Sequence, residues 1–253
     1  MSTLLKIEKV KKSFGGVQAL RGVSFEVRRG QIKALIGPNG AGKTTLFHIV
    51  TGVEKPNSGV VYFKGERIDG RRPDEVVRMG IARTFQNVQP FAGMTVLENV
   101  MTGRHRLIRS GAFRTLLRTR FMRSEEGKVR DEAMQFLEFV GLADCASQDA
   151  LDLPFGRQRL LELARALATE PELLLLDEPA AGLNTRETSE LAELIRKIRD
   201  SGVTVLLVEH DMELVMDISD EVVVLDRGEK IAEGPPESIQ RDERVVRAYL
   251  GGE

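Results

Sequence analysis

The residues best suited to chemistry form a glycine-rich run at 37–44, which reads G-P-N-G-A-G-K-T. It lies between an apolar stretch, Ile32 to Ile36, and a segment of helical composition that begins near Lys43. Glycines in such a loop let consecutive backbone N–H groups turn toward an anion, and the following helix N-terminus adds partial positive charge. A plain turn between a strand and a helix does not require the Gly-Lys-Thr ending, so the run predicts a nucleotide-phosphate site.

Two side chains in this loop have distinct expected roles. Lys43 supplies a full positive charge for the β- and γ-phosphates, and the Thr44 hydroxyl is placed to bind a magnesium ion. The residues expected to contact the nucleotide are Gly37, Pro38, Asn39, Gly40, Ala41, Gly42, Lys43, Thr44 and Thr45.

A second reactive group follows a purely apolar run, Leu173 to Leu176, which ends in Asp177 and Glu178. An unbroken apolar run is typical of a strand buried on both faces, and ligands collect beyond the carboxyl ends of such strands. We expect Asp177 to hold Mg²⁺, usually through water, and Glu178 to orient or deprotonate an attacking water. Two solvated acids would be the simpler interpretation if the pair stood alone, but the phosphate loop favours the catalytic one.

Hydrophobic periodicity indicates the elements that must position these groups. Residues 3–30 alternate apolar and polar positions with glycine turns, which predicts antiparallel strands, and Val60 to Ile68 adds another. Helical patterns dominate from about residue 88 to 165. Strands and helices then alternate and end in a hairpin, Val222 to Ile231, and a short C-terminal helix. The sequence therefore predicts an α/β fold with a side sheet and a helical region.

Composition is typical of a compact protein in a reducing compartment. The chain has 253 residues, 42% hydrophobic and 30% charged, and its net charge of −1 gives no argument for nucleic acid as a partner. A single cysteine, Cys145, excludes an internal disulfide framework. No stretch approaches the roughly 18 consecutive apolar residues that cross a bilayer, and the N-terminus lacks a signal-peptide pattern. We expect the protein to reach a membrane only through partners.

The order of several further segments resembles that of ATP-binding cassette (ABC) proteins from end to end. Residues 153–167 read L-P-F-G-R-Q-R-L-L-E-L-A-R-A-L, like the signature sequence of that family. Gln86 lies in R-T-F-Q-N, residues 178–184 read E-P-A-A-G-L-N, and His210 follows the strand-like Val203 to Val208.

Within the family, the likeness is greatest to the ATPase subunits of branched-chain amino acid importers. It is carried by residues 81–104, by 178–184 and by the terminal A-Y-L-G at 248–251. The resemblance implies a P-loop NTPase of the ABC type, with a RecA-like core and two subdomains. The expected parts are an antiparallel β subdomain at about 3–30 and 58–70, a nucleotide core at about 31–57, 71–87 and 166–253, and a helical subdomain at about 88–165.

The resemblance also assigns roles to three more residues. Phe14 would stack on adenine, although a phenylalanine in a strand-rich segment is as often part of the core. Gln86 would contact magnesium and the attacking water, or else be a surface polar residue. His210 would contact the γ-phosphate, which suits a histidine just past a strand better than local packing does. The other two histidines, His48 and His105, lack such a setting and are expected to be structural or exposed.

The signature segment departs from the family pattern. The usual Leu-Ser-Gly-Gly opening is replaced by Leu-Pro-Phe-Gly, and proline brings neither a hydroxyl nor a backbone N–H. Gly156 can still offer its N–H at a helix N-terminus. We therefore expect a weakened contact with the partner's ATP, which Pro154→Ser would strengthen. The residues expected to form that contact are Pro154, Phe155, Gly156, Arg157 and Gln158, and those expected in the loop facing the partner are Gly182, Leu183 and Asn184.

As implied by the resemblance, two cassettes would enclose two ATP molecules with Mg²⁺, and hydrolysis would reopen the pair. The expected partners are a second ATPase subunit, identical or related, transmembrane permease subunits, and indirectly a periplasmic or extracellular binding protein. The expected location is the cytoplasmic face of the cell membrane. Two alternatives stay open, an ATPase of a lipopolysaccharide or other lipid exporter and a soluble ABC ATPase; the sequence does not identify the transported substrate.

The most uneven charge run in the chain is also a candidate interaction surface. Residues 104–130 contain nine Lys or Arg against Glu125 and Glu126. Phe113, Leu116, Leu117 and Phe121 share one face of a predicted helix there. A solvated helix face is the usual explanation of such a run. The sharper hypothesis is a contact with anionic headgroups or with the loops of a membrane partner.

Overall fold

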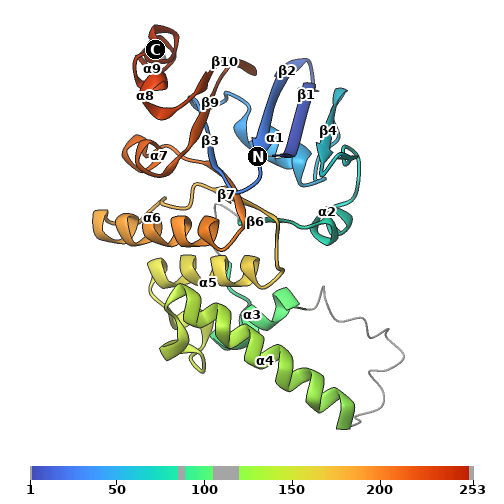
Figure 1. Cartoon of the computed structure of the whole chain (residues 1–253), viewed down its shortest axis with the longest axis vertical. Helices are drawn as coiled ribbons and strands as arrows, with labels where there is room; N and C mark the ends of the chain where they lie inside the picture. The colour runs from blue at the N-terminus through green and yellow to red at the C-terminus, as the bar shows by residue number, and fades with distance from the viewer. Residues whose placement is uncertain (1, 85–88, 105–119, 251–253) are drawn as a thin grey trace. The chain divides into compact units, whose positions relative to one another are not determined.

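The computed structural model describes residues 2–84, 89–104 and 120–250. The chain folds into two compact units, which are both drawn in Figure 1. The first unit comprises residues 1–85 and 172–253, and the second comprises residues 86–171. No helix of the described residues is both long and apolar enough to span a membrane.

The first unit is built on a six-stranded sheet with the order β10-β9-β3-β8-β7-β6. Its strands are β3 (Ile32–Ile36), β6 (Ile81–Arg83), β7 (Leu173–Asp177), β8 (Thr204–Val208), β9 (Glu221–Asp226) and β10 (Glu229–Gly234). All neighbours pair in parallel except β10, which pairs antiparallel with β9 and confirms the predicted hairpin. Every residue of β3, β7 and β8 is buried, as expected for strands covered on both faces.

An antiparallel sheet with the order β2-β1-β4-β5 forms the other layer of strands in this unit. Its strands are β1 (Thr3–Phe14), β2 (Val17–Arg28), β4 (Ser58–Phe63) and β5 (Glu66–Arg67). The predicted antiparallel strands are therefore confirmed, and the run at 60–68 is a tight hairpin. Its turn residues, Lys64 and Gly65, both have positive φ angles, 53° and 80°.

One hydrophobic core joins the two sheets of the first unit. It includes Leu5 and Val23 from the antiparallel sheet, Phe47 from a helix, and Leu175 and Val208 from the parallel sheet. Figure 1 shows α6 and α7 on the side of the parallel sheet away from β1 and β2. The helices of this unit are α1 (Lys43–Val50), α2 (Pro73–Met79), α6 (Thr185–Asp200), α7 (Met212–Ile218), α8 (Pro236–Gln240) and α9 (Glu243–Leu250).

The second unit is helical where the structure describes it. It contains α3 (Val96–Arg104), α4 (Arg120–Val140), α5 (Phe155–Leu167) and two short 3₁₀ turns, Ala143–Cys145 and Ala150–Asp152. The three α-helices pack on one another. The signature segment, residues 153–167, contains α5, and the predicted subdomain boundary at residue 165 falls inside this helix.

The buried position of Arg104 contradicts the prediction that this residue belongs to a surface-facing basic segment. Its side chain is 7% exposed and forms ion pairs with Glu132 and Glu170 inside the second unit. The guanidinium also donates to the backbone oxygen of Ala168 at 3.2 Å, and its carbon lies 5.9 Å from the centre of the Phe136 ring. Arg104 therefore holds α3 to its neighbours. Most of the basic run, residues 105–119, lies outside the described residues.

Candidate functional site

The register of the parallel strands brings the predicted reactive segments to one edge of the sheet. β8 lies between β3 and β7, with Val208 paired with both Leu35 and Asp177. The phosphate loop follows β3, Glu178 directly follows β7, and His210 is the second residue after β8. Because the carboxyl ends of neighbouring parallel strands meet at one edge, segments far apart in sequence become neighbours there.

The phosphate loop needs glycine for packing as well as for access. A Cβ added to Gly37, whose φ is 149°, would lie 2.1 Å from the backbone oxygen of Leu225. A Cβ on Gly42, whose φ is 104°, would lie 2.6 Å from the backbone oxygen of Ala19. The loop is therefore wedged between β9 and β2, and no larger residue fits at either end.

Lys43 begins α1 and is 6% exposed. Its ammonium donates to the backbone oxygens of Gly37 at 2.6 Å and Pro38 at 3.0 Å. Burial lowers the pKa of this ammonium, while Glu178 and Asp177 act in the opposite direction. The charge thus lies within the loop, beside the acids of β7, where a phosphate chain would need it. Thr44, next in α1, is exposed.

Glu178 and His210, both predicted to be catalytic residues, lie in contact with each other. The Glu178 carboxylate oxygen Oε1 lies 3.0 Å from His210 Nε2, with side chains 19% and 41% exposed. Glu178 has a φ of 49°, an unusual conformation for a non-glycine residue. Its N–H donates to Val208 O at 2.9 Å, and its own carbonyl accepts from Ala181 at 3.1 Å. A strained backbone so fixed is typical of functional positions.

Asp177 has a cationic partner that the sequence interpretation missed. Arg83, the last residue of β6, donates to its Oδ2 at 2.6 Å, and both side chains are 7% exposed. The guanidinium carbon also lies 5.6 Å from the centre of the Phe47 ring. The available signal was an arginine just before T-F-Q, but only the pairing of β6 with β7 brings it to Asp177.

Of four further residues considered from the sequence, two lie within the described residues and two do not. Phe14 ends β1 with 45% of its surface exposed, so it is not a core residue, and Lys12 Nζ lies 4.8 Å from its ring centre. His48 is half-buried, and its pKa is lowered by burial and then by Arg83. Gln86 and His105 fall outside the described residues.

The signature residues begin α5 in the second unit. Pro154 is the N-cap, Phe155 is 47% exposed, and Gly156 lies in the first turn, where helix N–H groups have no partner within the helix. Arg157 and Gln158 are held locally. Arg157 donates to Asp144 at 3.0 Å, and Gln158 donates to Leu153 O at 2.9 Å.

Asn184, predicted to face a partner, has a clear role within the chain. It caps α6, because its Oδ1 accepts a hydrogen bond from Glu187 N–H at 3.0 Å. The Asn184 N–H in turn donates to the Glu187 carboxylate at 2.9 Å. Gly182, two residues earlier, has a φ of 82°, and Leu183 donates to Ala180 O at 3.1 Å. This loop is therefore well defined between Glu178 and α6.

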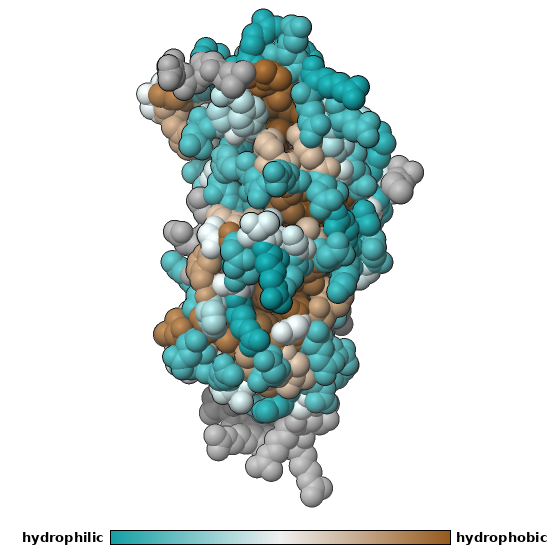
Figure 2. All heavy atoms as spheres, turned by 90° about the vertical axis from the view of Figure 1, so that its left-hand side faces the viewer, coloured by the Kyte–Doolittle hydropathy of each residue, from teal (hydrophilic) through white to brown (hydrophobic). Residues whose placement is uncertain are grey.

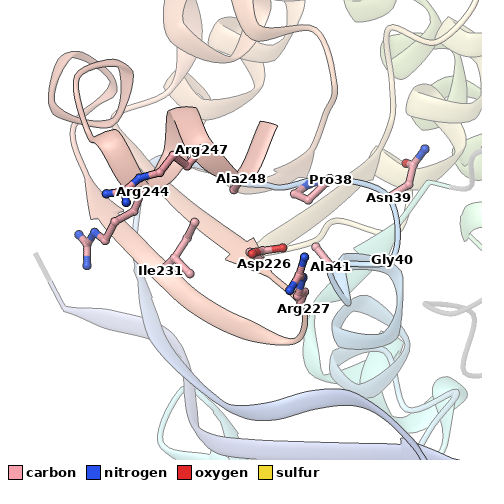
Figure 3. A pocket seen from close by; sticks show the side chains of 10 residues that line it. All are labelled: Pro38, Asn39, Gly40, Ala41, Asp226, Arg227, Ile231, Arg244, Arg247 and Ala248. Atoms are coloured by element: carbon pink, nitrogen blue, oxygen red, sulfur yellow. The ribbon is translucent and has the colours of Figure 1, made fainter. Parts of the chain in front are cut away.

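The C-terminal helix approaches the phosphate loop, which the sequence interpretation did not anticipate. A cavity of about 550 Å³ separates them, and Figure 3 shows Pro38 and Asn39 on one side with Arg244 and Arg247 on the other. Burial raises the pKa of the Tyr249 phenol to about 12. A hydrogen bond with the Gly37 backbone acts on this pKa in the opposite direction.

Apolar side chains of α7, α8 and α9 line a second hollow that reaches the residue before the loop, Ile36. Figure 2 views the molecule from the side of these helices and shows hydrophobic surface among hydrophilic residues in its upper part. The C-terminal helices therefore border one cavity at the phosphate loop and a second, apolar hollow beside it.

Comparison with known proteins identifies the family. A family model described as "ABC transporter" matches residues 20–181, and one described as "Branched-chain amino acid ATP-binding cassette transporter" matches residues 229–253. The chain is 45% identical to the high-affinity branched-chain amino acid transport ATP-binding protein LivG of Salmonella typhimurium, with 98% of each chain covered. It is 44% identical to the corresponding protein BraF of Pseudomonas aeruginosa, again over 98% of each.

Among solved structures, an ATP-binding cassette of an ABC transporter in its ADP conformation has a TM-score of 0.87. The two sequences are 35% identical, and both chains are covered completely. The predicted fold class is thereby confirmed. Since the first family model alone covers more than half of the chain, the protein belongs to the ABC transporter family and is one of its ATP-binding, ATP-hydrolysing subunits.

Proposed function

We propose that this chain powers a membrane importer of branched-chain amino acids. The contact of Glu178 with His210 at 3.0 Å, beside the phosphate loop, is the observation that supports ATP hydrolysis at this edge. The substrate class is supported by relatives named for branched-chain amino acid transport, at 44–45% identity over nearly the whole chain. The C-terminal match at residues 229–253 points the same way.

In the proposed mechanism, Glu178 takes the proton of the attacking water. His210 Nε2 orients the Glu178 carboxylate and reaches the γ-phosphate, Lys43 binds the β- and γ-phosphates, and Phe14 stacks on adenine. Gln86 is assigned to the same water.

Mg²⁺ bound with ATP would neutralise phosphate charge. Its proposed ligands are Thr44, Gln86 and Asp177, whose oxygen atoms are the donors this ion prefers. Of these, Thr44 is exposed at the start of α1, and Asp177 ends β7 with an oxygen-donor carboxylate that Mg²⁺ would have to share with Arg83, 2.6 Å away.

Two protomers are proposed to close on two ATP molecules. Gly156 would present its N–H to the γ-phosphate of the opposite protomer, with Gly182, Leu183 and Asn184 at the same interface. Pro154 supplies no hydroxyl, so the contact of this signature segment with the opposite ATP would be weaker. A second, different ATPase subunit would compensate for that weakness.

Pro154→Ser would then raise turnover and ATP-driven dimerisation. Unchanged values of both would contradict the hypothesis of a weakened signature contact.

The chain would lie peripherally on the cytoplasmic face of the membrane. Its partners would be permease subunits docked on the helical subdomain, about residues 88–165, and indirectly an external binding protein. The antiparallel sheet and the nucleotide core would form the remaining parts of the cassette. No nucleic acid partner is proposed.

Uptake in cells tests the substrate class, with a pull-down to identify the partners. Cells lacking this chain should lose uptake of labelled leucine, isoleucine and valine, keep uptake of arginine, and regain the loss with the wild-type chain but not with Glu178→Gln. Tagged Glu178→Gln in ATP should recover permease subunits from native membranes, whereas Lys43→Ala should not. Normal leucine uptake together with recovery of lipid-export components would contradict the proposal.

A further inference from the structure

Glu209 is a buried carboxylate for which the proposed mechanism has no role. It follows β8 directly, between Val208 and His210, and only 3% of its surface is exposed. Burying an ionised carboxylate is unfavourable unless hydrogen bonds or charges compensate for the lost water. Its surroundings therefore have to supply donors.

Three backbone N–H groups from two different loops supply them. Oε1 accepts from Ala180 at 2.7 Å. Oε2 accepts from His210 at 2.7 Å and from Asp211 at 3.2 Å. Ala180 is buried in the loop that carries Glu178 and leads to the Asn184 cap, whereas the other two donors form the turn that begins α7. One side chain thus joins the loops after β7 and β8.

From this arrangement we propose that Glu209 is a positioning residue that fixes the distance between Glu178 and His210. The Glu178 N–H is already held by Val208 O at 2.9 Å. Glu209 holds the next turn of the same loop and, with its other oxygen, the His210 backbone. Ala180 lies just before residues 182–184, which would face a partner protomer under the proposed function. Movement of those residues would therefore be passed to His210.

Only a carboxylate can serve both loops at once. An ionised glutamate has two acceptor oxygens and no donor. Glutamine keeps the length but replaces one oxygen with NH₂, which would face a backbone N–H whichever way the amide turns. Glu209→Gln therefore breaks one of the two connections without creating a cavity. Glu209→Asp keeps both acceptors on a side chain one methylene shorter.

A double-mutant cycle tests the proposal. Turnover and KM for ATP would be measured for wild type, Glu209→Gln, His210→Ala and the double variant, with Glu213→Gln, an exposed residue of α7, as the matched control. We expect Glu209→Gln to lower kcat about 10- to 100-fold, because misplacement by an ångström has effects of that order. KM should change less than about twofold, since the phosphate loop is untouched, and the double variant should be no slower than His210→Ala, within about twofold.

Two outcomes would overturn the proposal, and a third separates it from the proposed function on which it rests. Wild-type kcat in Glu209→Gln, or an equal loss with and without His210, would exclude positioning through His210. Wild-type kcat in His210→Ala would instead refute the proposed role of His210, and this proposal with it. Should Glu209→Gln fail to fold, Glu209→Asp enters the same cycle with the same criteria, and its circular dichroism and melting curve establish that it is folded.

Discussion

Glu178 combines a chemical and a conformational demand in one residue. Its carboxylate must reach His210, yet its backbone has a φ of 49°, which an L-residue adopts only at a cost of about 1 kcal/mol relative to glycine. The hydrogen bonds to Val208 and Ala181 hold that conformation. The sequence predicted the acid from its place after an apolar strand. It could not predict the strain, because left-handed backbone at a glutamate has no compositional signal.

The strain predicts a stability difference between two inactive variants. Glu178→Gly and Glu178→Ala both remove the contact with His210, but only glycine tolerates the left-handed backbone freely. Glu178→Gly should therefore be about 1 kcal/mol more stable than Glu178→Ala. Urea denaturation followed by circular dichroism measures the difference. Equal stability, or a more stable alanine variant, would show that the conformation is not strained.

At the scale of elements, sequence patterns predicted the secondary structure of single segments well. They predicted less well which segments lie in contact. Local spacing was enough to predict three segments: the phosphate loop, the hairpin at the end of the sheet and the signature segment. The ion pair of Arg83 with Asp177 was missed, since it depends on β6 lying beside β7. Tyr249 was missed for the same reason. It is 212 residues from Gly37 in the sequence, and no local pattern predicts that α9 reaches this glycine.

Packing of the phosphate loop against β9 predicts different tolerance at two glycines. Both Gly37→Ala and Gly40→Ala impose a positive φ on alanine, but only at Gly37 would the new Cβ overlap a backbone oxygen, at 2.1 Å. Gly40 has no heavy atom within 4 Å of that position. We expect Gly37→Ala to be less stable than Gly40→Ala by about 1–3 kcal/mol, the usual range for overpacking. Similar urea midpoints for the two variants would contradict this account of the loop.

At the scale of the whole molecule, the first unit depends on contacts between layers that sequence periodicity does not show. Glu172, just before β7, accepts from Lys64 of the β4–β5 turn at 2.6 Å and from Arg29 after β2 at 2.8 Å. The side-chain hydrogen bond from Lys64, with a further contribution from Arg29, lowers the pKa of Glu172 below its usual 4.5. The antiparallel sheet is thus tied electrostatically to the start of a catalytic strand.

This ion-pair cluster predicts a pH-dependent contribution to stability. Because the folded-state pKa of Glu172 is lowered, its stabilising effect is present above about pH 4.5 and is lost as the pH falls through the folded value. Glu172→Gln should therefore lower the melting temperature at pH 7 and lose that difference in more acidic buffer. An exposed control, Glu138→Gln, should follow wild type. A difference that stays constant down to pH 3 would show that Glu172 acts through packing alone.

Turnover of Glu178→Gln with MgATP, together with its ATP affinity, tests most directly that this edge of the sheet hydrolyses ATP. The amide keeps the size of the side chain but cannot take a proton from water. We predict that kcat falls about 10²- to 10⁴-fold, the usual contribution of a general base, while the affinity for ATP changes less than about twofold. Near-normal turnover would contradict the central claim and would require another residue to activate the water.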